Sequence, residues 1–200
     1  GDILTVRMVL GSLPGAMINP LVMLMGMENY YCSMYDCPEQ VHAAMNMACE
    51  VYERYYDFLE EEGLLLPTNG ISPIAQESFA FTEELPSDAV TRTTQCWGFL
   101  ESQETTAVSP ETFGEFVFPY QDRLVRRFGL LSYGCCERVD AIWPDSLSRW
   151  PNLRTLSVSP FNHEAQVGES LLGSWGVCYS NRRPTVVTVG APLDAGASGG

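Results

Sequence analysis

The chain contains 200 residues, of which 46% are hydrophobic, and this length and apolar content are sufficient for one sizeable hydrophobic core. Its 25 acidic and 11 basic residues give a formal charge of −14, which argues against binding to nucleic acid or to an anionic membrane surface, because both require clustered cations. All the basic residues are arginines, so the chain offers no lysine for Schiff-base chemistry.

The cysteines and the apolar runs predict a compartment. Seven cysteines are an odd number in a chain of this size, and no charged and then apolar leader opens the sequence, so we expect reduced thiols and a cytoplasmic protein. The longest apolar run, Ala16 to Met27, is shorter than the ~18 residues of a membrane span and contains Asn19 and Pro20. We therefore expect a soluble protein that does not enter a membrane.

The first 63 residues predict a strand and a long helix. Thr5 to Leu10 is rich in β-formers and precedes a turn-rich loop that ends at Gly15. Ile18 to Met27 lies within a methionine-rich region, which is typical of an adaptable core or a helix packed against a loop, or alternatively of a soft surface for an aromatic ligand or a corrinoid. Pro38 opens an amphipathic helix that ends at Gly63, with an apolar face formed by Val41, Ala44, Met45, Ala48, Val51, Tyr55, Phe58 and Leu59.

The middle of the chain predicts a β-α-β unit. Leu64 to Pro67 is an expected strand. The polar stretch from Glu77 to Thr94 is an expected long loop, which is a substrate lid, a disordered segment or a packed excursion. A strand at Trp97 to Phe99 is followed by a helix that starts at the Ser109 cap and runs to about Arg127. The next strand is expected at Leu130 to Tyr133.

The last third repeats this alternation. We expect a short helix at Asp145 to Trp150, a strand at Thr155 to Val158, a helix around Glu164 to Leu172 and a strand at Gly176 to Ser180. Alternating strands and helices predict a parallel sheet, and no Gly-x-Gly-x-x-Gly phosphate fingerprint follows any strand. We therefore predict a (β/α)8 TIM-barrel type of fold, as an incomplete barrel of about six strands over residues 1–190, with a flexible tail at 191–200.

Chemically active side chains follow several predicted strands. Glu101 and Gln103 follow one strand and Cys135, Cys136 and Glu137 follow the next, and such exits share one face of a parallel α/β fold. One hypothesis is a zinc site with ligands drawn from Glu101, Cys135 or Cys136, Glu137 and Cys178, where the metal would lower the pKa of a substrate thiol. The alternatives are that the two thiols are buried packing residues while Glu101 pairs with an arginine, or that one cysteine is a nucleophile or redox group.

Three further residues are candidates at strand exits. His163 is placed as a general acid or base, and Arg182, with Arg183 beside it, is placed to bind a substrate carboxylate or to lie on the surface. Tyr133 either hydrogen-bonds a ligand or fills the top of the barrel. The candidate catalytic residues are thus Tyr133, Glu137 and His163, and the candidate cofactor-binding residues are Glu101, Gln103 and Arg182.

Several segments together resemble the uroporphyrinogen decarboxylase superfamily, which includes cobalamin-dependent methyltransferases that pass methyl groups to coenzyme M. The segment Ser109 to Tyr120 (SPETFGEFVFPY) resembles the superfamily in general. Four other segments resemble a poorly characterised branch of this superfamily. They are Trp97 to Glu104 (WGFLESQE), Arg127 to Leu130 (RFGL), Tyr133 to Glu137 (YGCCE) and Pro151 to Pro160 (PNLRTLSVSP). The similarity covers about residues 38–190, which would correspond to the later strands of a TIM barrel.

The resemblance implies a zinc site and a methyl-transfer reaction. Methyltransferase members hold zinc with a His-x-Cys pair at this strand end and with a later cysteine; here Tyr133 and Cys135 occupy the pair, so the histidine is replaced. Cys136, Glu101 or Cys178 would complete the ligand set. Decarboxylase members hold the tetrapyrrole with amino-terminal arginines and an aspartate, and the matching region is missing from this chain.

Three functions follow as hypotheses. The leading one is an enzyme that transfers a methyl group from a corrinoid, free or on a corrinoid protein, to a small thiol acceptor with the help of zinc. The second is metal-free decarboxylation of a tetrapyrrole, as in porphyrin metabolism, and the third is a non-catalytic fragment that binds a corrinoid or a partner domain. A barrel that lacks strands would expose sheet edges, so a homo-oligomer is a further expectation.

Overall fold

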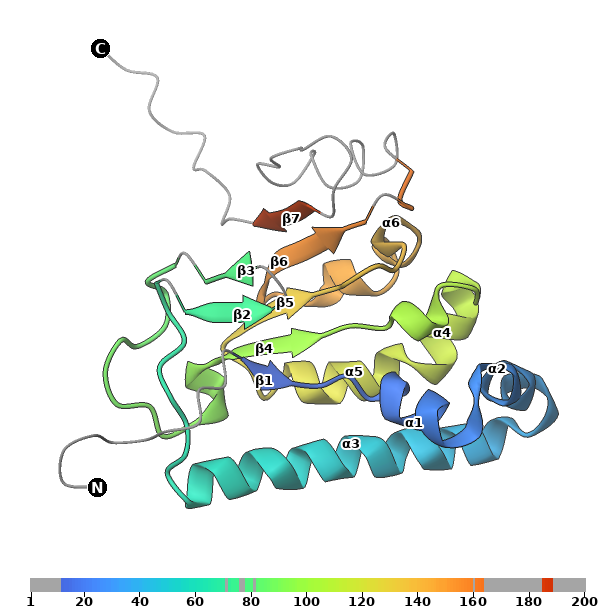
Figure 1. Ribbon diagram of the computed structural model, residues 1–200, viewed down its shortest axis with the longest axis horizontal. Helices are drawn as coiled ribbons and strands as arrows, with labels where there is room; N and C mark the ends of the chain where they lie inside the picture. The colour runs from blue at the N-terminus through green and yellow to red at the C-terminus, as the bar shows by residue number, and fades with distance from the viewer. Residues whose placement is uncertain are drawn as a thin grey trace, which may run out of the picture.

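The protein is described by a computed structural model at residues 12–70, 72–75, 78–80, 82–159, 161–163 and 185–188. A five-stranded sheet has the order β1-β4-β5-β6-β7, and its first four strands are parallel (Figure 1). They are β1 (Leu13–Pro14), β4 (Trp97–Leu100), β5 (Leu130–Tyr133) and β6 (Leu153–Val158), and β7 (Thr185–Thr188) is antiparallel to β6. The mixed α/β class and the parallel sheet are confirmed, and the sheet of the described residues is open.

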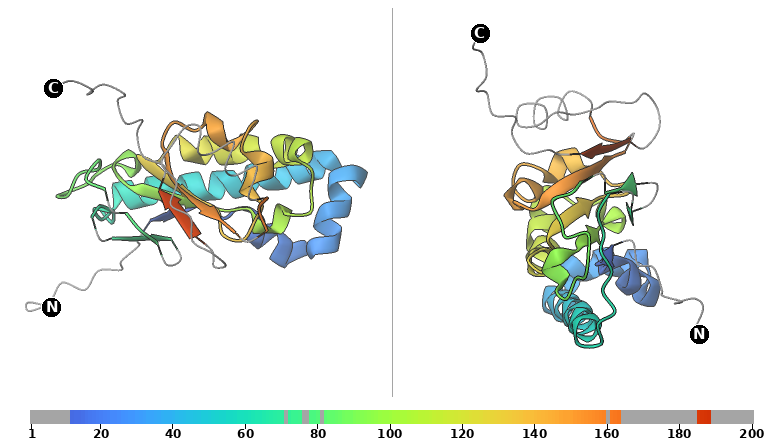
Figure 2. Two further views of the ribbon diagram at one scale, coloured as in Figure 1. Left: turned by 90° about the horizontal axis from the view of Figure 1, so that it is seen from above. Right: turned by 90° about the vertical axis from the view of Figure 1, so that its left-hand side faces the viewer.

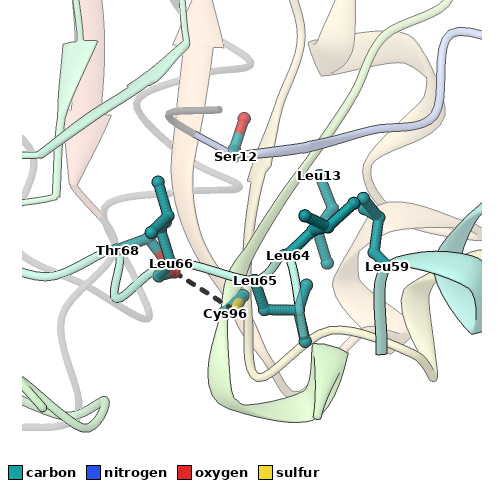
Figure 3. A pocket seen from close by; sticks show the side chains of 8 residues that line it. All are labelled: Ser12, Leu13, Leu59, Leu64, Leu65, Leu66, Thr68 and Cys96. Carbon is teal, nitrogen blue, oxygen red and sulfur yellow. Dashed lines mark hydrogen bonds between the residues drawn. The ribbon is translucent and has the colours of Figure 1, made fainter. Parts of the chain in front are cut away.

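Two predicted strands lie outside the described residues, at Thr5 to Leu10 and at Gly176 to Ser180, as do the helix around Glu164 to Leu172 and the tail. The strand at Leu64 to Pro67 was a wrong prediction, because this segment has no strand pairing. Its leucines instead line a small, mostly apolar cavity with Leu13 and Cys96, whose Sγ lies 3.6 Å from the Leu66 carbonyl oxygen (Figure 3). Leu65 is buried in this way at 7% exposure without belonging to a strand, whereas Leu64 is half-exposed.

Six α-helices are present among the described residues. They are α1 (Ile18–Met25), α2 (Met27–Asp36), α3 (Pro38–Glu61), α4 (Pro110–Phe116), α5 (Phe118–Val125) and α6 (Val139–Ile142). Single 3₁₀ turns occur at η1 (Thr93–Gln95), η2 (Gln103–Thr105) and η3 (Leu147–Arg149). None of the described helices is long and apolar enough to cross a membrane.

The long helix α3 confirms the predicted start and end, but its buried face is rotated relative to the prediction. The buried residues are Val41, Met45, Cys49, Tyr56 and Leu59. Val51 and Phe58 are half-exposed instead, because the row at four-residue spacing is the one that packs against the rest of the fold. Periodicity therefore predicted the helix correctly and its orientation only in part.

The helix predicted from Ser109 to about Arg127 is divided at Val117 into α4 and α5. Pro119 has no N–H and its ring conflicts with a carbonyl of the preceding turn, so a continuous helix is unfavourable here. The cap is as predicted, since Ser109 Oγ accepts a hydrogen bond from the Thr112 N–H at 3.2 Å. The helix expected at Asp145 to Trp150 contains only the turn η3, and α6 begins earlier.

The two faces of the sheet are covered differently (Figure 2). Helix α5 packs on one face, where Leu124, Leu131 and Tyr133 belong to the main hydrophobic core. On the other face, the strands β2 (Pro73–Ala75) and β3 (Ser78–Phe79) form a separate antiparallel pair, and Ile74 packs with Trp97 and Leu130 in a smaller core. The parallel strands point toward the end of the molecule where α1, α2 and α4 gather, and this end holds the strand exits (Figure 1).

Candidate functional site

The exits of β4 and β5 lie side by side, as predicted. Leu100 and Tyr133 are paired at the last position of the two strands, and the Gly134 N–H donates to the Leu100 carbonyl oxygen at 2.9 Å. Gly134 has a φ of 98°, a left-handed conformation that favours glycine, and it turns the chain out of β5. The segments that begin at Glu101 and at Cys135 are thereby brought together.

Glu137 joins these two exits through its carboxylate. Its Oε1 accepts a hydrogen bond from the Ser102 N–H at 2.7 Å, and its Oε2 accepts one from the Cys135 N–H at 2.7 Å. The residue is only 2% exposed, and burial raises the pKa of its carboxyl group although the backbone donors oppose that rise. Glu137 therefore holds the shape of the site in addition to contributing a carboxyl group.

Glu101 is buried with few partners. It is 7% exposed, and its Oε2 accepts one long hydrogen bond, from the Gln103 N–H at 3.2 Å. Burial raises the pKa of Glu101 to about 7, and the neighbouring charge of Glu104 adds to this effect, as does that of Glu137. A carboxyl group with this pKa exchanges its proton near neutral pH and is suited to general acid–base chemistry.

Glu104 is the third buried carboxyl group and was not among the predicted site residues. It is 6% exposed; Asn19 Nδ2 donates to its Oε1 at 2.7 Å, while its Oε2 is buried without a hydrogen-bond partner among the described residues. Asn19 belongs to α1, which follows β1, so three strand exits contribute to the site. The acidic spacing of Glu101 and Glu104 was a signal for this residue, but no sequence signal indicated Asn19.

The three carboxyl groups lack a positive partner in the part of the chain that the structure describes. No arginine or histidine nitrogen there lies within 4.0 Å of Glu101, Glu104 or Glu137. The predicted alternative in which Glu101 pairs with an arginine is therefore not found among these residues. Buried carboxylates without a counter-charge are costly, so the site favours the binding of protons or of a cation.

The two thiols belong to the residues just before Glu137 in the chain. Cys135 Sγ lies 3.6 Å from Cys136 Sγ, with Cys135 partly buried and Cys136 exposed. Burial, followed by the adjacent Cys136 thiol and the charges of Glu137 and Glu101, raises the pKa of Cys135 to about 12. The Cys135 thiol therefore holds its proton at neutral pH unless a cation binds beside it.

The predicted metal ligands are brought together in part. Cys135, Cys136 and Glu101 are close enough for their charges to affect the Cys135 pKa, and Cys178 lies outside the described residues. Within the described ranges, no group of three or more histidine, cysteine, aspartate or glutamate side chains is arranged to hold a metal ion. The donor types suit zinc, whereas the described side chains do not form a complete zinc site.

Tyr133 and Gln103 differ strongly in exposure. Tyr133 is fully buried, with its hydroxyl group 2.6 Å from Ser102 Oγ and its ring centroid 5.5 Å from that of Trp150. Burial raises the pKa of Tyr133 well above its usual value. This placement agrees with the packing alternative, whereas Gln103 is exposed at the surface of the site.

His163 belongs to a neighbouring polar network. The ring Nδ1 of His163 lies 2.6 Å from Arg138 Nη2 and 3.3 Å from Asp140 Oδ2. The backbone N–H of His163 donates a hydrogen bond to Asp140 Oδ2. Burial raises the pKa of Asp140, but hydrogen bonds from Arg138 and from the His163 backbone outweigh that effect, so its pKa lies below the usual value. Arg182, the predicted cofactor-binding arginine, lies outside the described residues.

A surface groove leads to this region. It is lined by Met27, Gln103, Glu104, Thr106, Cys136 and Phe161. Phe161 is 67% exposed and Met27 is 41% exposed, so an apolar rim surrounds Glu104 and Cys136. The groove gives a ligand with an apolar part a route to one of the buried carboxyl groups and to the exposed thiol.

Comparisons with known protein families, with characterised proteins and with solved structures found no match for this chain.

Proposed function

We propose that this chain is part of a TIM-barrel enzyme of the uroporphyrinogen decarboxylase superfamily type that transfers a methyl group from a corrinoid to a small thiol acceptor. The single observation that carries this proposal is the buried carboxyl group of Glu101, with a pKa of about 7, beside a pair of thiols at adjacent exits of parallel strands. A thiol acceptor must lose a proton to become a nucleophile. A group that takes up a proton near neutral pH is therefore what this reaction requires.

In this proposal Glu101 is the general base. Its carboxylate would take the S–H proton of the acceptor. The resulting thiolate would attack the methyl carbon while the bond from that carbon to the corrinoid breaks, and the electron pair of that bond would leave with the corrinoid. The corrinoid, bound free or on a carrier protein, supplies the methyl group. Glu137 keeps the exits of β4 and β5 together through the Ser102 and Cys135 amides, so that the acceptor and Glu101 are held at a fixed distance.

Among the described residues, the three buried carboxyl groups have no counter-charge within 4.0 Å, and this also supports a cation. We propose zinc, held by Cys135 and Cys136 together with Cys178, which lies outside the described residues, so that Glu101 keeps its role as the base. Bound zinc would lower the pKa of the acceptor thiol. The described side chains alone do not complete its coordination, and the proton step at Glu101 stands without it.

The runner-up reaction, decarboxylation of a tetrapyrrole, receives less support from this site. A polycarboxylate substrate needs cations to bind it, and the described strand exits present three carboxyl groups with no arginine within 4.0 Å. A tetrapyrrole would therefore meet charge repulsion at Glu101, Glu104 and Glu137.

Elemental analysis and a methyl-transfer assay test the proposal together. The full-length protein, purified without added metal or chelator, is expected to contain about one zinc per chain. The Cys135→Ser/Cys136→Ser double variant should lose this zinc, and the Cys32→Ser/Cys37→Ser double variant, altered in and after α2, is the matched control. Demethylation of methylcobalamin by 2-mercaptoethanol should slow at least tenfold in Glu101→Gln.

Two results would contradict the proposal. If the wild-type protein contains no metal and has no methyl-transfer activity, both the zinc site and the methyl-transfer reaction are contradicted. Equal activity of wild type and Glu101→Gln would remove the general-base role, even if zinc were present.

Self-association is proposed from the edges of the sheet. Among the described strands, β1 and β7 each have one neighbour, and unpaired strand edges favour pairing with another chain. Light scattering is expected to give a mass above the 22.2 kDa of one chain, and a monomer at all concentrations would refute this expectation.

A further inference from the structure

Cys135 and Cys136 form a vicinal dithiol that is placed to react as a unit. Their sulfur atoms are 3.6 Å apart, and Cys136 is exposed in the surface groove next to Phe161. The left-handed turn at Gly134 redirects the chain just before the pair, so the two side chains do not point to opposite faces as they would in an extended strand. The pair differs in exposure, with one thiol accessible and the other partly covered.

We infer that Cys135 and Cys136 are a thiol–disulfide exchange site that closes to a vicinal disulfide and thereby changes the strand-exit site. The sulfur atoms need to approach by less than 2 Å to reach the S–S bond length of about 2 Å. The oxidant is a small-molecule disulfide. No other pair of cysteine sulfurs within the described ranges shares a contact of this kind.

The reaction proceeds in two exchange steps. The Cys136 thiolate attacks one sulfur of the oxidant; the oxidant's S–S bond breaks, and the first thiolate leaves. Cys135 Sγ then attacks Cys136 Sγ while its proton passes to solvent, and this attack releases the second thiolate. Both leaving thiolates take up protons, so two cysteines are oxidised by two electrons while one disulfide is reduced to two thiols.

The closed bond should be easily reversible. Consecutive Cα atoms are about 3.8 Å apart, which is below the usual Cα separation of about 4.4–6.8 Å in disulfides. The resulting small ring is strained, and strained, exposed disulfides are the labile ones that serve regulation. A modest excess of a reduced thiol should therefore reopen the bond.

Closure should affect the carboxyl site because the backbone of Cys135 is part of it. The Cys135 N–H donates to Glu137 Oε2 at 2.7 Å, and the Cys135 carbonyl oxygen accepts from Ser157 Oγ at 2.9 Å. Forming the small ring requires the peptide between the two cysteines to rotate. This rotation moves the Cys135 carbonyl oxygen away from Ser157 Oγ directly, and it reaches the N–H that binds Glu137 through the Cα of Cys135. The effect on catalysis rests on the proposed function, whereas formation of the bond does not.

The experiment reads the bond itself. The reduced, chelator-treated full-length protein is incubated with increasing ratios of oxidised to reduced glutathione, quenched with acid and alkylated, and its peptides are weighed. We expect the peptide with Cys135 and Cys136 to lose both alkyl groups together and to be lighter than the dithiol by two hydrogen atoms. Reduced glutathione in excess should restore both alkylation sites.

Single variants separate the two steps. Cys135→Ser should stop at a mixed disulfide between Cys136 and glutathione, and Cys136→Ser should react more slowly because its remaining thiol is partly covered. The Cys32→Ser/Cys37→Ser control should close as wild type does. Phenylarsine oxide, which bridges neighbouring thiols, should protect both sulfurs of the wild-type protein from alkylation and neither sulfur of a single variant.

The inference is overturned if both cysteines remain alkylated at every ratio, if both accumulate mixed disulfides without closing, or if either one pairs with a different cysteine. Closure of the bond without any methyl transfer would leave this inference standing while the proposed function fails. Methyl transfer by a protein that never closes the disulfide would overturn this inference and leave the proposed function standing.

Discussion

Removing the charge of Glu101 should make the folded protein more stable at alkaline pH. Glu101→Gln keeps the size of the side chain and an oxygen that accepts the Gln103 N–H, but it cannot ionise. In the wild type, burial raises the pKa of Glu101 from the usual 4.5 to about 7. The folded state therefore binds this proton more tightly than the unfolded state does.

The pH window and the magnitude follow from this difference. Below pH 4.5 both states are protonated and the contribution of Glu101 to stability is fully present; as pH rises through about 7 it is lost. The difference between about 7 and 4.5, at about 1.4 kcal/mol for each pKa unit, corresponds to about 3 kcal/mol. Because Glu101 is 7% exposed, solvent screens little of this effect.

Urea unfolding followed by circular dichroism between pH 4.5 and 8.5 measures the free energy of unfolding in both proteins. We expect the two proteins to be similar near pH 4.5 and the variant to be more stable by about 3 kcal/mol above pH 8. Glu39→Gln, altered at an exposed glutamate in the first turn of α3, is the control for loss of one charge. A variant whose difference from wild type is the same at every pH would refute the reasoning.

Three other substitutions test the packing and the polar contacts. Asn19→Ala removes the donor to Glu104 and should lower the free energy of unfolding by about 1–3 kcal/mol in urea unfolding, and an unchanged midpoint would contradict the role of this bond. Gly98→Ala would place a Cβ 2.0 Å from the Phe128 ring, so a loss of about 1–3 kcal/mol or more is expected in thermal unfolding, whereas wild-type stability would show that the ring moves without cost. Asp140→Asn should remove a stabilisation that the wild type loses as pH falls below the usual 3.8, because the pKa of Asp140 is lowered in the folded state; acid unfolding at an unchanged pH midpoint would be the contrary result.

The sequence predicted those parts of the fold that depend on local signals. The first-turn proline Pro38, the Ser109 cap and the apolar periodicity placed α3 and the start of α4. The β-rich runs placed β4, β5 and β6. The break at Val117 had a local signal in Pro119 that the amphipathic pattern outweighed. Leu64 to Pro67 was wrongly assigned because a short apolar run is equally compatible with a buried loop.

The candidate site was predictable to the extent that it depends on strand order. Placing Glu101 and Cys135 after adjacent parallel strands required only the β-α-β pattern, and the structure brings these exits together. The roles within the site depend on burial and on contacts between distant segments, which a pattern does not contain. Asn19 reaches Glu104 across 85 residues, and the raised pKa of Glu101 arises from desolvation in the folded state.

The central claim is that Glu101 exchanges its proton near neutral pH inside the strand-exit site. Carbon-13 NMR of the full-length protein, labelled at the glutamate carboxyl groups and freed of metal with a chelator, measures this directly. The account predicts a carboxyl resonance that titrates with a midpoint of about 7 and is missing from Glu101→Gln. If the resonance that disappears in this variant titrates near 4.5 instead, the account is contradicted.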